Sequence, residues 1–584
     1  MKPRYMKFLY LLVAVAVVTG TAVADEKESV FLWNTVINNN DLMPFAEPRT
    51  FNSYNPPSVN TKGMVVVRAR SRGGQGLGPA THGIYTRDMG QTDAEIIRIL
   101  DRTSPVPGPN NLGTTFVETP SFPRIDMHSD TIATRGNHQP VFEYESEGDE
   151  TRAGTTGIYS NPYGGDLVTG AAKLGHVPDF DFFGVPNKPG VPFEVFPGAP
   201  SITDGNIIAF KGNFSLDETE NTGVYFRHLL PETAGGAHPA YLIASTETLI
   251  PGTGTHFGST APPNAADRKV VFAGFDNEWA PTLGGIYMAP LAPMPRLRTL
   301  VSIGQRVPGD KTKARFNALG EGMAFDGRYV GFWGAWGDET RELKLYCPQE
   351  GNKDRIAYCN QALICEDAVE PIGDDNSICD DESDPNYGIS CYTEQDVPVN
   401  QGIFVHDTRT RRTHLLARTG EDFDDFLFWN YAGKAPCTGG GHHGGGEEGG
   451  EEDGESVRWR SSAYLAVSTG IRATFRSAFK ARTAETVDKV YVDPVDGIYL
   501  REGPGRSPIL TVAETTMVGQ LLDPEAPVDS TIVEVGIERE GLRGDWLAIN
   551  AKMGVEDGEE EDDLAGIYIT KLDPRTCCRA PAAN

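Results

Sequence analysis

The sequence lacks the short motifs that identify several common enzyme classes. It has no Gly-x-Ser-x-Gly nucleophile elbow, no His-Glu-x-x-His zinc motif and no Gly-x-x-x-x-Gly-Lys-Ser/Thr phosphate loop. No dinucleotide-binding glycine fingerprint follows a predicted strand. No catalytic residue is therefore identified by motif, and an enzymatic function rests on analogy of fold alone.

Long apolar stretches are also scarce. The one pronounced run is at residues 8–18. It follows a basic start with Lys2, Arg4 and Lys7, and it precedes a small-residue cleavage site at Ala22-Val23-Ala24. This pattern predicts a secretory signal peptide at residues 1–24. The alternative, a membrane anchor, needs about 20 apolar residues. We therefore expect an exported product without a membrane span after signal removal, located in the periplasm, at the cell surface or outside the cell.

Basic residues are too few to balance the acidic ones. The chain has 52 Lys and Arg against 81 Asp and Glu, a formal net charge of −29. Such a surface repels phosphate backbones and anionic membranes. We expect no nucleic-acid partner, while an extracellular or cell-surface protein, a polysaccharide or a divalent cation stays open.

What the chain does have is one short phrase of glycine, a β-branched residue and an aromatic residue, repeated along its length. The seven copies are Gly83-Ile84-Tyr85, Gly157-Ile158-Tyr159, Gly223-Val224-Tyr225, Gly285-Ile286-Tyr287, Gly402-Ile403-Phe404, Gly497-Ile498-Tyr499 and Gly566-Ile567-Tyr568. β-Branched and aromatic residues favour strands, and none of them supplies a proton donor at neutral pH or a metal ligand. The phrase predicts architecture and is silent on chemistry.

Three further segments recur around each phrase. An aromatic residue with a proline-bearing turn comes first, then a short apolar run, then the phrase, then a Leu/Ile-rich run that leads to Val-Pro-Gly or its remnant, as in residues 193–210 and 300–309. Short runs of Val, Ile, Phe and Tyr bounded by Gly, Pro, Asp or Asn are typical of strands. Four strands in each of seven units predict an all-β fold, a seven-bladed β-propeller at residues 25–573 with a tail at 574–584. A pair of β-sandwiches is the rival architecture.

The two ends of the repeat complement each other. The last unit, at Gly566, has no fourth strand after it, whereas residues 30–36 precede the first unit and have the composition of such a strand. We predict that residues 30–36 pair in the last blade and close the ring, which would remove both exposed sheet edges.

Two insertions interrupt the repeat, at about residues 338–400 and 434–456. The first is acidic and cysteine-rich, and the second is a Gly/His/Glu-rich tract typical of a flexible loop. An even number of cysteines in an exported chain predicts disulfides, with candidates Cys347, Cys359, Cys365, Cys379, Cys391, Cys437, Cys577 and Cys578. A zinc site is the alternative, although the first insertion has no Cys-x-x-Cys pair. The connectivity stays open.

Three groups of residues carry metal or acid/base hypotheses. The first insertion offers oxygen ligands for calcium, without the spacing of an EF-hand, at Asp374, Asp375, Asp380, Asp381 and Asp384. In the second insertion, His442-His443 could bind a transition metal if the tract became ordered. A recurring Asx residue before the second strand forms either a ring of carboxylates or a set of hairpin turns, and we favour turns, at Asn60, Asp126, Asp204, Asp267 and Asp326.

The whole unit resembles a family of exported bacterial repeat proteins of unassigned function. The best matching stretches are residues 242–251, 193–210 and 300–307, and the resemblance covers nearly the whole mature chain outside the insertions. It implies a propeller-like fold and export, and it carries over no catalytic residue. The chain lacks the Ser-x-Asp-x-Gly-x-x-Trp turns of sialidase-type propellers and the tryptophan docking repeats of quinone-dependent dehydrogenases.

We therefore expect a non-catalytic binding or scaffolding module. The alternatives are an extracellular hydrolase or lyase, metal-dependent or not, with its site at one mouth of a central channel, and a structural component of a surface layer or appendage. Clustered His, Arg, Glu or Asp from non-adjacent blades would favour the enzyme.

Overall fold

The computed structural model describes residues 31–572, except residues 74–77, 231–236, 349–352, 363, 368–388, 433–457, 471–473, 504–506 and 556–562. The predicted signal peptide, the tail and the whole of the second insertion, with His442-His443, lie outside the described residues. So do the five calcium candidates and four of the eight cysteines, Cys379, Cys437, Cys577 and Cys578.

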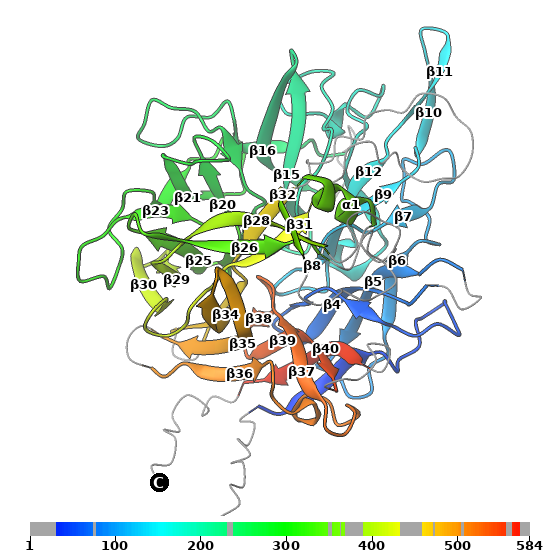
Figure 1. The fold of residues 1–584 in the computed structure, drawn as a ribbon. Coiled ribbons are helices and arrows are strands. Elements are labelled where there is room, and N and C mark those ends of the chain that lie inside the picture. The colour runs from blue at the N-terminus through cyan, green and yellow to red at the C-terminus, as the bar shows by residue number, and fades with distance from the viewer. Residues whose placement is uncertain are drawn as a thin grey trace, which may run out of the picture.

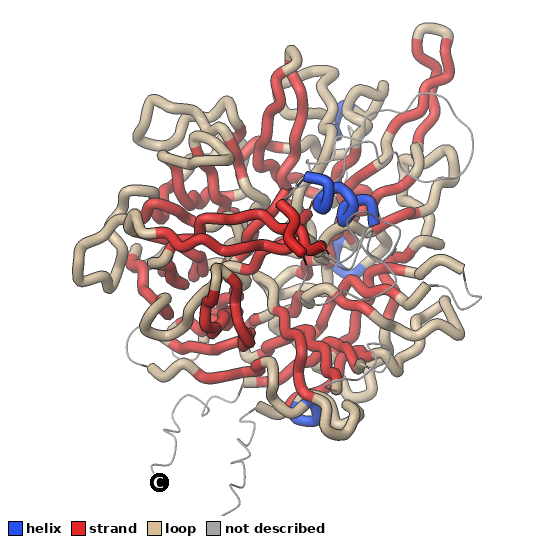
Figure 2. The backbone as a smooth tube through the Cα atoms, in the orientation of Figure 1, coloured by secondary structure: helices blue, strands red, loops and turns tan. Residues whose placement is uncertain are grey.

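Seven small antiparallel sheets form a ring, so the predicted seven-bladed β-propeller is confirmed (Figure 1). Strands dominate the described chain and helices are few (Figure 2). Each blade has an inner strand, usually broken in two, and three further strands. The first pieces of the inner strands are β2 (Ser53–Tyr54), β7 (Phe116–Glu118), β18 (Ser259–Thr260), β23 (Phe316–Leu319) and β37 (Thr531–Gly536). The second pieces are β3 (Ser58–Val59), β8 (Arg124–Ile125), β14 (Ser201–Thr203), β19 (Asn264–Ala266), β24 (Ala324–Phe325), β33 (Leu465–Thr469) and β38 (Leu542–Arg543).

The remaining strands of each blade follow in order from the axis outward. The second strands are β4 (Met64–Arg70), β9 (Ile132–His138), β15 (Ile207–Leu216), β20 (Lys269–Phe275), β25 (Tyr329–Trp336), β34 (Phe475–Val487) and β39 (Trp546–Gly554). The third strands, which carry the repeated phrase, are β5 (His82–Asp88), β12 (Thr156–Ser160), β16 (Thr219–His228), β21 (Gly284–Pro290), β29 (Gln401–Asp407), β35 (Val490–Glu502) and β40 (Leu564–Lys571). The outer strands are β6 (Ile97–Asp101), β13 (Val168–Ala172), β17 (Tyr241–Ser245), β22 (Arg298–Ser302), β30 (Arg412–Arg418), β36 (Leu510–Glu514) and β1 (Trp33–Asn38).

The inner strands define the axis of the ring. Their second pieces contact one another in the order β3, β8, β14, β19, β24, β33, β38 and back to β3. First pieces contact the preceding blade instead: β18 packs against β16 and β17, and β37 against β35 and β36. The proline-bearing turn that follows the aromatic residue, such as Pro56-Pro57, separates the two pieces. The first recurring segment of the unit therefore contains two short strands.

The first strand closes the ring, as predicted. β1 pairs with β40, with Trp33 opposite Thr570 and Asn38 opposite Gly566, so the blue and red ends of the chain meet in one blade (Figure 1). The strand spans Trp33–Asn38 and not residues 30–36. The last three residues of the strand are buried, whereas Leu32, which lies just before it, is exposed.

Close packing explains why the repeated phrase begins with glycine. The tyrosine two residues later points to the same face of the strand, and its ring lies against the glycine. A Cβ added at Gly223 would lie 2.6 Å from the Tyr225 hydroxyl, and one at Gly157 would lie 2.8 Å from that of Tyr159. No side chain larger than hydrogen fits there.

The tyrosine in turn packs edge-on against the aromatic residue of the same blade's inner segment. Ring centroids lie 4.9 Å apart for Phe51 and Tyr85, and 4.8 Å apart for Phe116 and Tyr159. The same edge-on contact recurs in three further blades, in the pairs Phe193–Tyr225, Phe257–Tyr287 and Phe316–Phe404. In blade six the rings of Phe423 and Tyr499 are in contact but tilted by 47°. The two recurring segments therefore form one core unit of each blade.

Neighbouring strands are antiparallel, so their connections alternate between two ends of the ring. We call the insertion end the one that carries the connections between second and third strands and those between blades. Its hairpins and extra sheets are β10 (Phe142–Ser146) with β11 (Asp149–Ala153), β26 (Thr340–Tyr346) with β28 (Ile389–Pro398) and β27 (Ile364–Asp367), and β31 (Phe428–Ala432) with β32 (Arg458–Ser462). In Figure 1 the last two groups are drawn across the middle of the ring.

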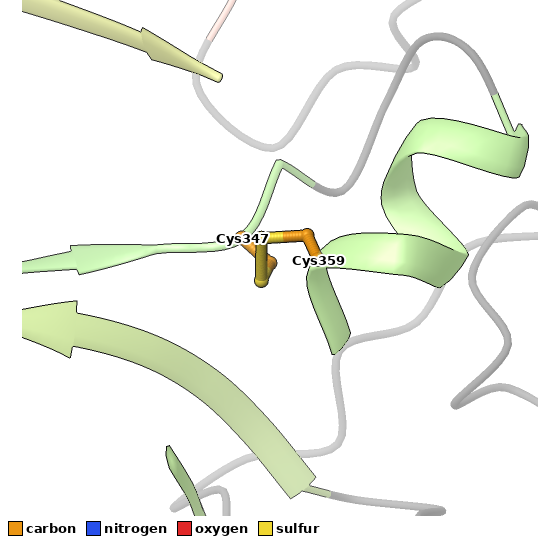
Figure 3. Close-up of a disulfide and its surroundings, with 2 residues drawn as sticks. All are labelled: Cys347 and Cys359. Atoms are coloured by element: carbon orange, nitrogen blue, oxygen red, sulfur yellow. A yellow bond between two sulfur atoms is a disulfide. The ribbon is translucent and has the colours of Figure 1, made fainter. Parts of the chain in front are cut away.

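The first insertion also contains a helix that the sequence did not predict, α1 (Lys353–Ala362). Cys359 on α1 forms a disulfide with Cys347, which follows β26 (Figure 3). Cys391 is also disulfide-bonded, and Cys365 lies opposite it in the β27–β28 register. Disulfide formation is thus confirmed for part of the predicted set. No helix in the described residues is long and apolar enough to cross a membrane.

Candidate functional site

Charged side chains from two non-adjacent blades meet at the axis. Arg124 lies on β8 in blade two, and Glu538 lies between β37 and β38 in blade seven. Arg124 Nη2 donates to Glu538 Oε2 at 2.6 Å, and their side chains are 2% and 10% exposed. Together with Arg539, Glu540 and Arg543 they form what we call the axial cluster.

The axial cluster is paired internally. Arg539 Nε lies 3.6 Å from Glu538 Oε2, and Arg543 Nη2 lies 3.6 Å from Glu540 Oε1. Burial raises the pKa of Glu538, but the charges of Arg124 and Arg539 lower it by more, so its net pKa lies below the ordinary value. Burial and the charge of Arg124 lower the pKa of Arg539 to about 10. Glu538 is therefore an ionised acceptor at neutral pH and has no proton to donate.

The recurring Asx residues lie in turns between the first and second strands of the blades, at the end of the ring opposite the insertion end. Asp126 Oδ1 accepts from the backbone N–H groups of His128 and Ser129 at 2.8 and 2.7 Å. Asp326 Oδ1 accepts in the same way from Arg328 and Tyr329 at 3.0 and 2.6 Å. The carboxylates hold hairpins, which agrees with the turn interpretation.

Of the remaining members of this set, Asp204 and Asp267 are exposed to solvent, whereas Asn60 is buried. Asn60 accepts from the backbone of Lys62 at 2.9 Å, Asp204 pairs with Arg268 at 3.2 Å, and Asp267 lies 3.8 Å from His128 Nε2. Among the described residues, no three His, Cys, Asp or Glu side chains are gathered in the manner of a metal site.

Three histidines lie within the blades and not at an open surface. Burial lowers the pKa of each to about 4, so they are neutral at pH 7: His82, His138 and His406. His138 Nε2 contacts the Tyr159 hydroxyl of the repeated phrase. The rings of His138 and His406 are buried in their blades, and that of His82 is half-buried.

The insertion end displays an aromatic residue that the sequence did not single out. Trp279 lies between β20 and β21 and is 75% exposed. All seven tryptophans are in the described chain, and the other six are buried or half-buried. The Arg458 guanidinium of β32 lies over the indole, 4.4 Å from its centroid, and forms an ion pair with Glu278. We call Glu278, Trp279 and Arg458 the Trp279 cluster.

Buried ionic contacts fix the first insertion against blade six. Arg341 on β26 donates to Asp425 Oδ2 at 3.1 Å and to the Tyr491 hydroxyl at 3.0 Å. Asp425 is fully buried and also accepts from Gln401 Nε2 at 2.9 Å. From α1, Arg355 Nη1 donates to the Tyr431 carbonyl on β31 at 3.5 Å. The extra sheets are therefore joined to the ring and to each other.

Comparisons with known proteins give no family. No protein-family model matches the chain, and no curated protein matches it. Solved structures with a similar arrangement include a family 117 glycoside hydrolase of the marine bacterium Zobellia galactanivorans, at 10% identity and a TM-score of 0.23, covering 53% of this chain and 86% of that one. A glycosyl hydrolase of Bacteroides ovatus gives 12% identity and a TM-score of 0.21, covering 53% and 88%.

A third similar structure is a sialidase of Trypanosoma rangeli, at 10% identity and a TM-score of 0.18, covering 93% of this chain and 97% of that one. With TM-scores this low, the three similarities carry no argument about activity. The assignment of the fold rests on the sheet topology of the chain itself.

Proposed function

We propose that the protein is an exported, non-catalytic binding module that contacts its ligand with the insertion end of the ring. The observation that carries the proposal is the exposure of Trp279, which is 75% exposed while the other six tryptophans are buried or half-buried. Exposed aromatic residues held in place are typical of contact surfaces. Export is supported by the predicted signal peptide and by the disulfide between Cys347 and Cys359.

The state of the axial cluster supports a non-catalytic role. Glu538 is held ionised between two arginines, so it cannot serve as a general acid. Asp126 and Asp326 are occupied by backbone N–H groups. These three carboxylates thus act in folding, and the exposed residues at the insertion end are our candidates for recognition.

The experiment separates binding from turnover. The mature protein is incubated with a panel of extracellular polysaccharides and cell-surface proteins, and both retention and the length of each polymer are measured. Saturable retention with no shortening of the polymer is expected. Shortening, or a loss of intact protein ligand, would overturn the non-catalytic assignment.

An extracellular hydrolase or lyase is the second candidate, and one observation favours it. Blades two and seven bring Arg124, Glu538 and Glu540 together, and Glu540 Oε2 is buried without a hydrogen-bond partner among the described contacts. If this carboxylate acts on a polymer, Glu540→Gln should abolish product release while Trp279→Ala weakens substrate capture. Unchanged release in Glu540→Gln would remove the axial cluster as the site.

A further inference from the structure

Trp279 lies in a loop whose backbone is hydrogen-bonded by the side chains of Asp276 and Asn277. Asp276 Oδ1 accepts from the backbone N–H groups of Thr282 and Leu283 at 2.9 and 3.0 Å. Inside that turn, Asn277 Oδ1 accepts from the Ala280 N–H at 2.7 Å, and Asn277 Nδ2 donates to the Ala280 carbonyl at 2.9 Å. The indole therefore projects from a preorganised loop, so little conformational freedom is left to lose on binding.

Two separate elements build the cluster. The loop belongs to blade four, whereas Arg458 comes from β32, the hairpin that precedes the inner strand of blade six. The guanidinium covers one side of the ring, and the 75% exposure of Trp279 shows that the rest of the ring is open to solvent. The Arg458 side chain is 25% exposed and that of Glu278 is 40% exposed, so both polar groups reach solvent beside the indole.

This combination narrows the chemistry of the ligand. A flat apolar face bordered by a guanidinium and a carboxylate matches a pyranose ring, whose C–H face stacks on an aromatic ring while its hydroxyls donate and accept hydrogen bonds. A nucleic-acid base is disfavoured because the net charge of −29 repels its phosphate backbone. A protein partner is also disfavoured, because a protein interface needs a broad surface of roughly 800 Å² on each partner and the Trp279 cluster has three side chains.

We propose that the open face of Trp279 is a stacking subsite for a sugar ring of an extracellular polysaccharide, with Arg458 and Glu278 bonding to its hydroxyl groups. The inference rests on the proposed binding function. Arg458 holds the indole in place and Glu278 holds Arg458, so all three side chains contribute to affinity.

The test uses the full mature protein and soluble neutral and acidic polysaccharides, with binding followed by affinity electrophoresis and by tryptophan fluorescence. Because Trp279 is the exposed tryptophan, a bound sugar should shield it from acrylamide quenching. Trp279→Ala should weaken binding about tenfold or more, as expected for the loss of one aromatic stack. Trp279→Phe should recover part of the affinity. Met294→Ala, at a side chain that is 94% exposed, is the matched control and should bind as the wild type does.

Each outcome decides a different point. Polysaccharide binding that is lost in Trp279→Ala, with an unchanged unfolding temperature, supports the subsite. Equal binding by wild type and Trp279→Ala overturns the subsite and leaves the binding function standing. Binding to a protein of the panel but to no polysaccharide overturns the sugar assignment. Wild-type protein that binds neither class overturns the proposed function itself.

Discussion

Arg124 and Glu538 are 414 residues apart in the sequence, and their side chains form an ion pair of 2.6 Å. The pair joins blade two to blade seven across the inner strand of blade one. That strand is bonded to both sides, because Ser58 Oγ donates to the Pro123 carbonyl and the Val59 N–H donates to the Glu540 carbonyl, each at 3.0 Å. The beginning and the end of the repeat are therefore tied together at the axis.

Replacing Arg124 by methionine should destabilise the protein strongly. The substitution leaves the buried Glu538 carboxylate without its closest partner, a change that costs about 3–5 kcal/mol in comparable buried pairs. Denaturant unfolding of the two proteins at pH 7 measures the difference. Arg152→Met, which removes an exposed pair with Glu143, is the control and should leave the stability nearly unchanged. Equal effects of the two substitutions would contradict the structural role of the axial pair.

The same pair should give a pH dependence of known sign. The pKa of Glu538 is lowered in the folded protein, so its stabilisation is present above the unfolded carboxyl pKa, about 4.3, and is lost as the pH falls through the folded value. The stability gap between wild type and Arg124→Met should therefore narrow below about pH 4. A gap that widens at acid pH would show that Glu538 is not the group responsible.

Adding a methyl group to the repeated phrase should disrupt its blade. In Gly223→Ala the new Cβ meets the Tyr225 hydroxyl at 2.6 Å, and the strand or the ring must move. Overpacking of this kind costs about 1–3 kcal/mol. Gly254→Ala is the control, because nothing lies within 4 Å of a Cβ there. The unfolding midpoints in denaturant compare the two, and an unchanged Gly223→Ala protein would refute the packing explanation of the phrase.

Truncating a buried side chain of β1 should lower the stability more than truncating an exposed side chain just before the strand. Ile37 is fully buried in β1, so Ile37→Ala should lose about 2–5 kcal/mol. Leu32 is 85% exposed, and Leu32→Ala should be nearly neutral. Thermal unfolding of both variants provides the comparison. Similar melting temperatures would mean that β1 contributes little to ring stability.

His138 should make the protein less stable in mild acid. Burial lowers its pKa to about 4 in the folded state, below the unfolded value of about 6.5. The contribution is complete above pH 6.5 and is lost as the pH falls toward 4, because the unfolded chain binds the proton first. In His138→Gln, the loss of unfolding free energy between pH 6.5 and pH 4 should be smaller than in the wild type by about 1–3 kcal/mol. His128→Gln, at a side chain that is 64% exposed, controls for the substitution itself.

Much of the fold was predictable because its signals are local and repeated. Gly-Ile-Tyr recurs with few changes because a Cβ at its glycine would meet either the ring two residues later, as at Gly223, or the neighbouring strand, as at Gly285. The first and last units also complement each other in strand count. Blade six departs from this local pattern. Its inner aromatic residue, Phe423, lies before the second insertion, yet it packs on Tyr499 with centroids 4.3 Å apart. Sequence spacing does not reveal a contact that spans an insertion.

The candidate site was much less predictable. Glu278 and Arg458 are 180 residues apart, and nothing in either local sequence indicates that they meet. One tryptophan among seven is ordinary in sequence, because its significance lies in exposure, which depends on the packing of the blades. The only local hint is the sequence Asp276-Asn277 before it, whose short side chains favour a tight turn.

Closure through β1 also sets the order in which the protein can assemble. The first strand emerges from the ribosome long before its partner, since Trp33 must wait for Thr570. Pairing at such a sequence separation is slow, and an unpaired edge is open to wrong partners in the meantime. Blade seven therefore needs both ends of the chain, and a chain that stops before β40 leaves the edge of β1 unpaired. The closed ring is thus available only to a chain that contains both β1 and β40.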